Sequence, residues 1–158
     1  MVQTAADHNY NAVVIQIRKR GDAYYFPTSP NTEPRASGIA ADFDPLQETI
    51  TQAHNAGLEV HAWIVTTLIA GETAPTDPAH VYNQHPEYLM KNSSGSAYFS
   101  GYGYYLDPGN PDANKWNYNV VMDIVNNYDI DGFHFDYIRY PYEDAGYNDV
   151  AIQRYNDE

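Results

Sequence analysis

The hydrophobic pattern divides the chain into three units, each a strand followed by a helix. The β-branched run at residues 12–17 and the apolar stretches at residues 58–65 and 132–136 have the length and composition of buried strands. Residues 44–57 and 110–128 carry apolar positions at helical spacing, and both begin with a capping residue before a proline, Asp44-Pro45 and Asn110-Pro111. Residues 2–11 are interpreted as a helix end with its turn, and Asn148 as the cap of a last helix. This alternation predicts an α/β fold with parallel strands.

The lengths of the connections indicate where a site would lie. The helix-to-strand turns have a few residues, whereas the strand-to-helix connections run over residues 18–43 and 66–109. Such long connections are usually functional, and in a parallel sheet they lie at the carboxyl ends of the strands, where these folds bind ligands. A closed barrel needs about 250 residues. We therefore predict that residues 1–158 are a single fragment of a (β/α)₈ barrel, about units two to four of eight, without the first strand and the C-terminal half. The alternative is a small three-layer domain that is complete in itself.

Composition narrows the function classes. The formal net charge of −13 disfavours nucleic acid and anionic membrane surfaces as partners, because the chain could not neutralise a run of phosphates. There is no Cys, which excludes thiolate chemistry, and no apolar run is long enough to span a membrane. No signal peptide opens the chain. The 16 Tyr are unusual, and Tyr suits a wet binding surface because it has an apolar face and a polar tip.

The third strand carries the strongest candidate for chemistry. Its period of two places His134 and Asp136 on one side and Phe133 and Phe135 on the other. A carboxylate at the carboxyl end of a barrel strand projects into the active-site mouth, where it can act as nucleophile, base or electrostatic stabiliser. The alternative for Asp136 is an ion pair with Arg139 that fixes the following loop. Asp129 and Asp131 precede the strand and are assigned to the turn.

Other candidates are weaker, and each has a structural alternative. His61 and Trp63 share a side of the second strand, where they could contact a ligand or pack the interior. Arg18 is expected to reach the rim after the first strand, with Asp22 and Tyr24 in the loop beyond it. Five aromatic residues at positions 98–105 alternate with Ser and Gly, which suits either carbohydrate binding or a small core that anchors the loop.

The sequence gives little support for a metal site, a phosphate-binding site or a serine nucleophile. His61, His134 and Asp136 form at most a partial metal set, because no His-x-His, His-Glu-x-x-His or second carboxylate at ligand spacing accompanies them. Phosphate-binding glycine loops and a Gly-x-Ser-x-Gly nucleophile motif are absent. We therefore expect no metal and no cofactor, although a metal-dependent hydrolase stays a third hypothesis.

Five ordered stretches together resemble one family. They are residues 13–25, residues 59–64, residues 85–89 (HPEYL), residues 106–111 (LDPGNP) and residues 132–142 (GFHFDYIRYPY). This combination resembles the glycosyl-hydrolase-like ten family, bacterial (β/α)₈-barrel proteins that are often exported as lipoproteins, and it covers almost the whole chain. Many members carry a second Asp directly after the one that corresponds to Asp136, whereas this chain has Tyr137.

The resemblance implies a glycoside hydrolase that acts on a polysaccharide, with bacterial cell-wall glycan as a plausible substrate. By analogy with related retaining barrels, Asp136 corresponds to the nucleophile or charge stabiliser. The residues expected to line the subsites are Arg18, Asp22, Tyr24, His61, Trp63, His134, Arg139 and Tyr140. The full-length protein is expected outside the cytoplasm, in the periplasm, at the outer membrane or secreted. A non-catalytic glycan-binding barrel is the alternative, favoured by Tyr137 at an otherwise acidic position.

The partner acid is the missing element of this hypothesis. Glycoside hydrolysis generally requires two carboxyl groups, and the sequence offers only Glu143 and Asp144 near Asp136, both expected in an exposed loop. The resemblance implies that the acid lies on a later strand, so we expect the 158-residue chain to be inactive alone. The sequence does not determine the oligomeric state, although unpaired sheet edges favour dimerisation.

Overall fold

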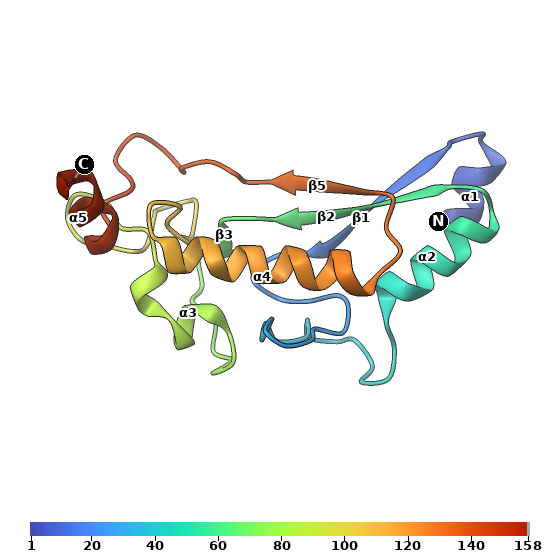
Figure 1. Cartoon of the computed structure of the whole chain (residues 1–158), viewed down its shortest axis with the longest axis horizontal. Helices are drawn as coiled ribbons and strands as arrows, with labels where there is room; N and C mark the ends of the chain where they lie inside the picture. The colour runs from blue at the N-terminus through green and yellow to red at the C-terminus, as the bar shows by residue number, and fades with distance from the viewer. Residues whose placement is uncertain (158) are drawn as a thin grey trace.

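The computed structural model describes residues 1–157 as a parallel sheet with helices packed on one side (Figure 1). The elements are α1 (Val2–Asp7), β1 (Ala12–Arg18), α2 (Pro45–Asn55), β2 (Glu59–Val65), β3 (Leu68–Ala70), α3 (Val81–Gln84), the 3₁₀-helix η1 (Pro86–Tyr88), β4 (Tyr104–Tyr105), α4 (Pro111–Asn127), β5 (Gly132–Asp136) and α5 (Asp149–Asp157). The three strands expected from the sequence form the main sheet, in the order β1-β2-β5, and both neighbouring pairs are parallel.

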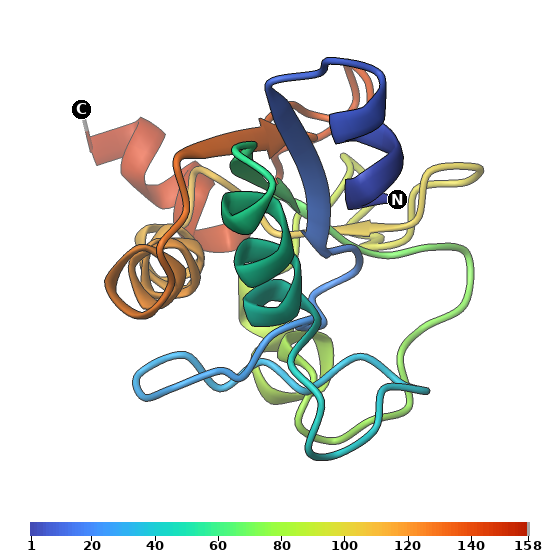
Figure 2. The same ribbon diagram turned by 90° about the vertical axis from the view of Figure 1, so that its right-hand side faces the viewer.

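The main core lies between this sheet and the helices α2 and α4 (Figures 1 and 2). Alternate strand residues face the helices, among them Ile17, Val60 and Ala62, and they meet Leu46 of α2 and Ile124 of α4. All five side chains are buried. Within residues 1–157, no helix layer of this kind covers the opposite face of the sheet, and Val14 of β1 is 57% exposed there. The sheet is therefore packed on one side only.

The predicted helix starts are confirmed at the hydrogen-bond level. The Asp44 side chain accepts a hydrogen bond from the Gln47 amide, and the Asn110 side chain accepts from the amides of the first turn of α4. Asn148 likewise accepts a hydrogen bond from the Val150 amide at the start of α5. These caps satisfy amides that have no partner within the helix, which explains why the sequence located the starts well.

The long connection from β2 to α4 contains structure that the hydrophobic pattern did not predict. Strands β3 and β4 form a two-stranded antiparallel sheet beyond the carboxyl end of β2. Phe99 and Tyr105 are buried in a second core with Val65, Leu68 and Met90. For these two aromatic residues the loop-anchoring interpretation holds, whereas Tyr102 of the same loop is 51% exposed.

No helix within residues 1–157 combines the length and the apolar character that crossing a membrane requires.

Candidate functional site

Asp136 lies at the carboxyl end of β5, and both of its carboxylate oxygens accept hydrogen bonds. The indole Nε1 of Trp63 donates to Oδ2 at 3.2 Å, and the backbone amide of Tyr137 donates to Oδ1 at 2.7 Å. The register explains the first contact, because Val65 of β2 pairs with Asp136 and Trp63 lies two residues earlier on the same face. The carboxylate therefore has a fixed orientation, at the sheet edge where parallel folds place their sites.

Trp63 and His134 lie beside this carboxylate on the uncovered face. They are register partners, and their rings meet edge to face with centroids 6.0 Å apart. The structure thus brings Trp63 of β2 beside His134 and Asp136, the two residues predicted to share a side of their strand. His61 lies two residues before Trp63 on β2, farther from the carboxyl edge of the sheet. Its Nε2 is 3.1 Å from Oε2 of Glu59, and its ring lies against Gly132.

The backbone turns sharply immediately after Asp136. Tyr137 has a φ of 51°, the left-handed region that a bulky side chain seldom adopts. The Thr67 hydroxyl donates a hydrogen bond to the Tyr137 carbonyl oxygen, and the Arg139 guanidinium lies 4.3 Å above the Tyr137 ring. Burial raises the pKa of the nearby Tyr105 hydroxyl, while the positive charges of Arg139 and Arg20 act in the opposite direction. Arg139 therefore lies at the carboxyl edge of the sheet, but over Tyr137 and not against Asp136.

Arg18 does not reach the rim as the sequence suggested. Its side chain is 0% exposed, and its guanidinium forms a two-pronged ion pair with Glu33, with Nε 2.8 and 2.9 Å from the two carboxylate oxygens. The guanidinium also donates to the carbonyl oxygens of Val65 and Thr66. The physical reason is that the loop after β1 folds back and covers Arg18 with a carboxylate. Arg18 thus joins the ends of β1 and β2.

Glu33 was missed by the sequence analysis. It is buried, and it also accepts a hydrogen bond from Trp116 Nε1 of α4 at 3.2 Å. Burial lowers the pKa of Arg18, but the charge of Glu33 and its hydrogen bond outweigh that effect, so the pKa is raised overall. The only signal in the sequence was a single acidic residue between two prolines of a long loop, which no spacing rule links to Arg18.

The remaining predicted site residues lie around the same edge with different contacts. Asp22 accepts hydrogen bonds from the backbone amides of Lys19 and Arg20, so it shapes its own turn. Tyr24 is half-buried, and its amide bonds the Ile17 carbonyl oxygen. Tyr140 is 44% exposed.

The loop after β5 carries the two acidic residues Glu143 and Asp144. Asp144 Oδ1 accepts a hydrogen bond from the Ser93 amide at 3.0 Å, and Glu143 is exposed. In residues 1–157, no three His, Asp or Glu side chains are grouped closely enough to hold a metal ion. The Asp131 carboxylate, assigned from the sequence to its own turn, instead accepts a hydrogen bond from the Val60 amide of β2, which lowers its pKa together with the bond to His54 of α2.

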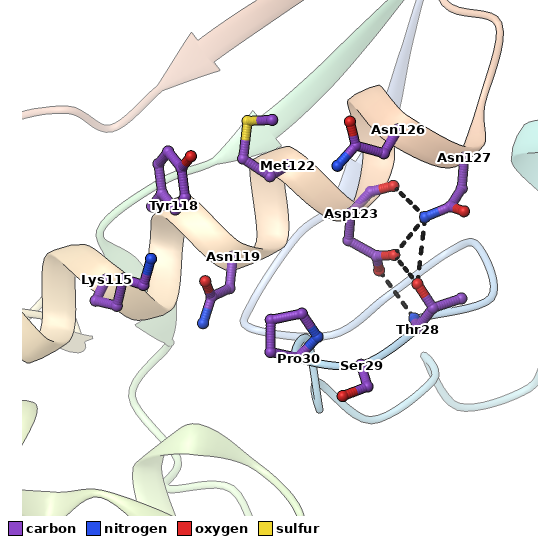
Figure 3. Close-up of a pocket in the computed structure, with 10 residues that line it drawn as sticks. All are labelled: Thr28, Ser29, Pro30, Lys115, Tyr118, Asn119, Met122, Asp123, Asn126 and Asn127. Atoms are coloured by element: carbon purple, nitrogen blue, oxygen red, sulfur yellow. Dashed lines mark hydrogen bonds between the residues drawn. The ribbon is translucent and has the colours of Figure 1, made fainter.

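A groove of about 330 Å³ runs between α4 and the loop at residues 28–30, and Figure 3 shows its lining. Asp123 is buried at one end and accepts hydrogen bonds from the Thr28 amide and from the side chains of Thr28 and Asn127 (Figure 3). Asn31 Nδ2 donates to the same carboxylate at 2.9 Å. These bonds fasten the loop to α4. The groove is lined by none of the site residues predicted from the sequence.

Comparisons with known proteins agree with this architecture. The chain is 30% identical to glycosyl hydrolase YngK of Bacillus subtilis (strain 168) over 142 residues, which are 86% of the chain and 26% of that relative. It is 32% identical to glycosyl hydrolase DigH of Escherichia coli (strain K12) over 105 residues, 60% of the chain and 22% of the relative. The chain thus spans about a quarter of the length of these curated relatives.

A solved structure supports the fold independently of sequence. The α-L-fucosidase isoenzyme 2 from Paenibacillus thiaminolyticus superposes on 99% of the chain with a TM-score of 0.74 at 19% identity, and the match covers 22% of that chain. At this identity the likeness concerns the fold alone. The model of the glycosyl hydrolase-like 10 family matches residues 1–158. The resemblance seen in the sequence is therefore confirmed, and the chain belongs to the glycosyl hydrolase-like 10 family.

Proposed function

We propose that this chain is the part of a glycoside hydrolase that supplies the carboxylate Asp136. The observation that carries the proposal is the fixed orientation of Asp136 between Trp63 Nε1 and the Tyr137 amide, at the carboxyl end of a parallel strand. Trp63 and His134 provide an aromatic and a polar surface beside it. The family membership and the glycosyl hydrolase names of the relatives support the same reaction class.

In this mechanism Asp136 acts on the sugar carbon of the scissile bond, as nucleophile or as stabiliser of the positive charge that develops there. A second carboxylic acid protonates the leaving oxygen, and the two groups are about 5–5.5 Å apart in retaining enzymes and about 6.5–9.5 Å apart in inverting ones. We place this acid outside residues 1–158, on a later strand. The proposal includes a (β/α)₈ barrel of which this chain forms about units two to four.

The proposed substrate is a polysaccharide, with bacterial cell-wall glycan as the first candidate, and the proposed location is outside the cytoplasm. A wet face with exposed Tyr side chains and a net charge of −13 suits an uncharged or weakly charged polymer better than a polyanion.

The test compares Asp136→Asn with wild type in the full-length protein. We expect the release of new reducing ends from peptide-free cell-wall glycan, or from another polysaccharide of a panel, to fall by about a thousandfold. The matched control is Asp129→Asn, because Asp129 lies before the same strand and its side chain is 93% exposed. Wild-type activity in Asp136→Asn would contradict the proposal.

A second candidate function is a glycan-binding barrel without catalysis. The observation that favours it is Tyr137, an aromatic residue where many family members carry a further Asp. Glycan binding by wild type and by Asp136→Asn, with no product from either, would establish this alternative.

A further inference from the structure

Two exposed tyrosines lie next to each other beyond the carboxyl end of the main sheet. Tyr102 belongs to the connection between β3 and β4, and Tyr142 belongs to the segment after β5, which Figure 1 shows at the end of the sheet to which β2 and β5 point. The two ring centroids are 5.5 Å apart, and the residues are 51% and 38% exposed. Together they form an aromatic surface, called the Tyr102–Tyr142 platform below.

Contacts beneath and beside the platform hold it in place. The buried Phe99 ring meets the Tyr142 ring edge to face, with centroids 5.4 Å apart. Lys91 fastens the connection before β4 to the segment after β5, because its carbonyl oxygen accepts a hydrogen bond from the Tyr147 amide at 2.9 Å and its Nζ donates to Asp149 Oδ2 at 2.8 Å. Rings that are already held in position lose little freedom when a ligand binds, so the platform is preorganised.

The platform is continuous with the candidate catalytic face. Phe99 is buried in the second core together with Val65, and Tyr137 packs against this core. Val65 is the register partner of Asp136, and Tyr137 directly follows Asp136 in the chain. One packed layer of side chains therefore extends from Asp136 to Tyr142. A polymer bound at Asp136 can follow this layer to the platform.

Ring chemistry and charge restrict what the platform binds. An exposed phenol ring offers an apolar face, on which the C–H face of a sugar packs, and a hydroxyl that bonds to sugar hydroxyls. Glu143 directly follows Tyr142 and is exposed, which disfavours a carboxylate or phosphate on the ligand. The cations of the two segments are already engaged, because Arg139 lies over the Tyr137 ring and Lys91 is held in the ion pair described above.

We propose that the Tyr102–Tyr142 platform binds an uncharged sugar unit of the polysaccharide at a distance from Asp136, so that long chains bind more tightly than short ones. The choice of a sugar as the ligand rests on the proposed function. A contact made far from the reacting bond is the same in the ground state and the transition state, so it lowers KM and leaves kcat unchanged.

The first test measures KM and kcat of the full-length protein on the polysaccharide that it degrades and on the shortest oligosaccharide of that glycan that it hydrolyses. We expect Tyr102→Ala and Tyr142→Ala each to raise KM for the polymer about tenfold, since one stacking surface is lost. The kcat on the polymer and the activity on the oligosaccharide should change less than about twofold. Tyr102→Phe should retain polymer binding, because the ring remains.

The matched control is Tyr118→Ala. Tyr118 is 54% exposed but lines the groove between α4 and residues 28–30 (Figure 3), so its removal should leave KM for the polymer unchanged. Thermal midpoints of all variants report whether the fold is retained, and Tyr102→Ala decides if Tyr142→Ala is destabilised. Equal losses on polymer and oligosaccharide, or an unchanged KM in Tyr102→Ala, would overturn the proposal.

A second test measures binding without catalysis, by retention of the full-length protein in gels that contain peptide-free cell-wall glycan, hydroxyethyl cellulose or polygalacturonate. We expect retention by at least one of the first two, weakened in Tyr102→Ala, and none by polygalacturonate, which carries a carboxylate on each unit. Retention by polygalacturonate that depends on Tyr102 would overturn the proposed ligand class. Tyr102-dependent retention without hydrolysis would support the platform and overturn only the proposed catalysis, whereas hydrolysis without any Tyr102 dependence would overturn the platform alone. Neither retention nor hydrolysis would overturn both.

Discussion

At the scale of single residues, the buried pair Arg18–Glu33 joins three parts of the molecule. Arg18 ends β1, its guanidinium bonds the carbonyl oxygens at the end of β2, and Glu33 accepts a bond from Trp116 of α4. Both charged side chains are 0% exposed. Removing one member of such a pair leaves the other charge buried and unpaired, which costs far more than an exposed pair contributes.

We therefore predict that Glu33→Gln lowers the free energy of unfolding by about 3–5 kcal/mol. The control is Glu59→Gln, whose exposed partner is His61, and its effect should stay within about 0.5 kcal/mol. Urea unfolding followed by circular dichroism measures both. Equal effects of the two substitutions would mean that the Arg18 pair adds nothing to stability.

The sequence predicted which residues share a strand face, but not what covers them. His134 and Asp136 were assigned to one side of β5, and His61 and Trp63 to one side of β2, because the period of two determines each pair. Arg18 was assigned to the rim by the same rule, yet it is buried because Glu33 folds over it from the loop. Contacts made by an irregular loop have no periodicity, so no spacing in the sequence indicated this pair.

At the scale of elements, the helices α2, α4 and α5 were predictable, whereas α3, η1 and the small sheet β3–β4 were not. Helix starts depend on local capping, and Asp44, Asn110 and Asn148 are each recognisable within three residues of what they bond. The strands of the small sheet have three and two residues, too few to show alternation. That sheet depends on a close backbone approach at Gly103, where an added Cβ would lie 2.1 Å from the Ala70 carbonyl oxygen.

Gly103→Ala tests this approach, with Gly101→Ala as the matched control. Both glycines have positive φ, 99° and 76°, so an alanine at either position is strained in its backbone conformation. A Cβ at Gly101, however, meets nothing within 4 Å. We expect Gly103→Ala to lower the free energy of unfolding by about 2 kcal/mol more than Gly101→Ala. Thermal unfolding of the pair measures the difference. Equal midpoints would show that β3 and β4 can separate without cost.

At the scale of the whole molecule, the sheet is covered on one face only, and its outer strands β1 and β5 each have one neighbour in the main sheet. Val14 on β1 and Phe135 on β5 are 57% and 46% exposed. An apolar groove of about 230 Å³ runs beside Val14. Unpaired strand edges with apolar side chains favour association with another chain. The net charge of −13 opposes association of two copies, and salt screens that repulsion.

We predict that the 158-residue chain associates with itself as its concentration rises, and more strongly at high salt. Val14→Lys should weaken this association about tenfold, since it places a charge at the edge strand. Val125→Lys is the control, because Val125 is 48% exposed on α4, away from the sheet edge. Sedimentation velocity measures both variants. An identical association constant for wild type and Val14→Lys would contradict the use of this edge.

The left-handed backbone of Tyr137 has a consequence for how the position can change during evolution. Asp, Asn and His are several-fold enriched in this conformation among residues other than glycine. Each of the three is reached from a tyrosine codon by exchanging its first base. A change to any of them would relieve the backbone at φ 51° while the turn that holds Asp136 is retained. A single base change at this position therefore suffices to place a second carboxylate beside Asp136. The left-handed backbone conformation there already favours Asp over Tyr.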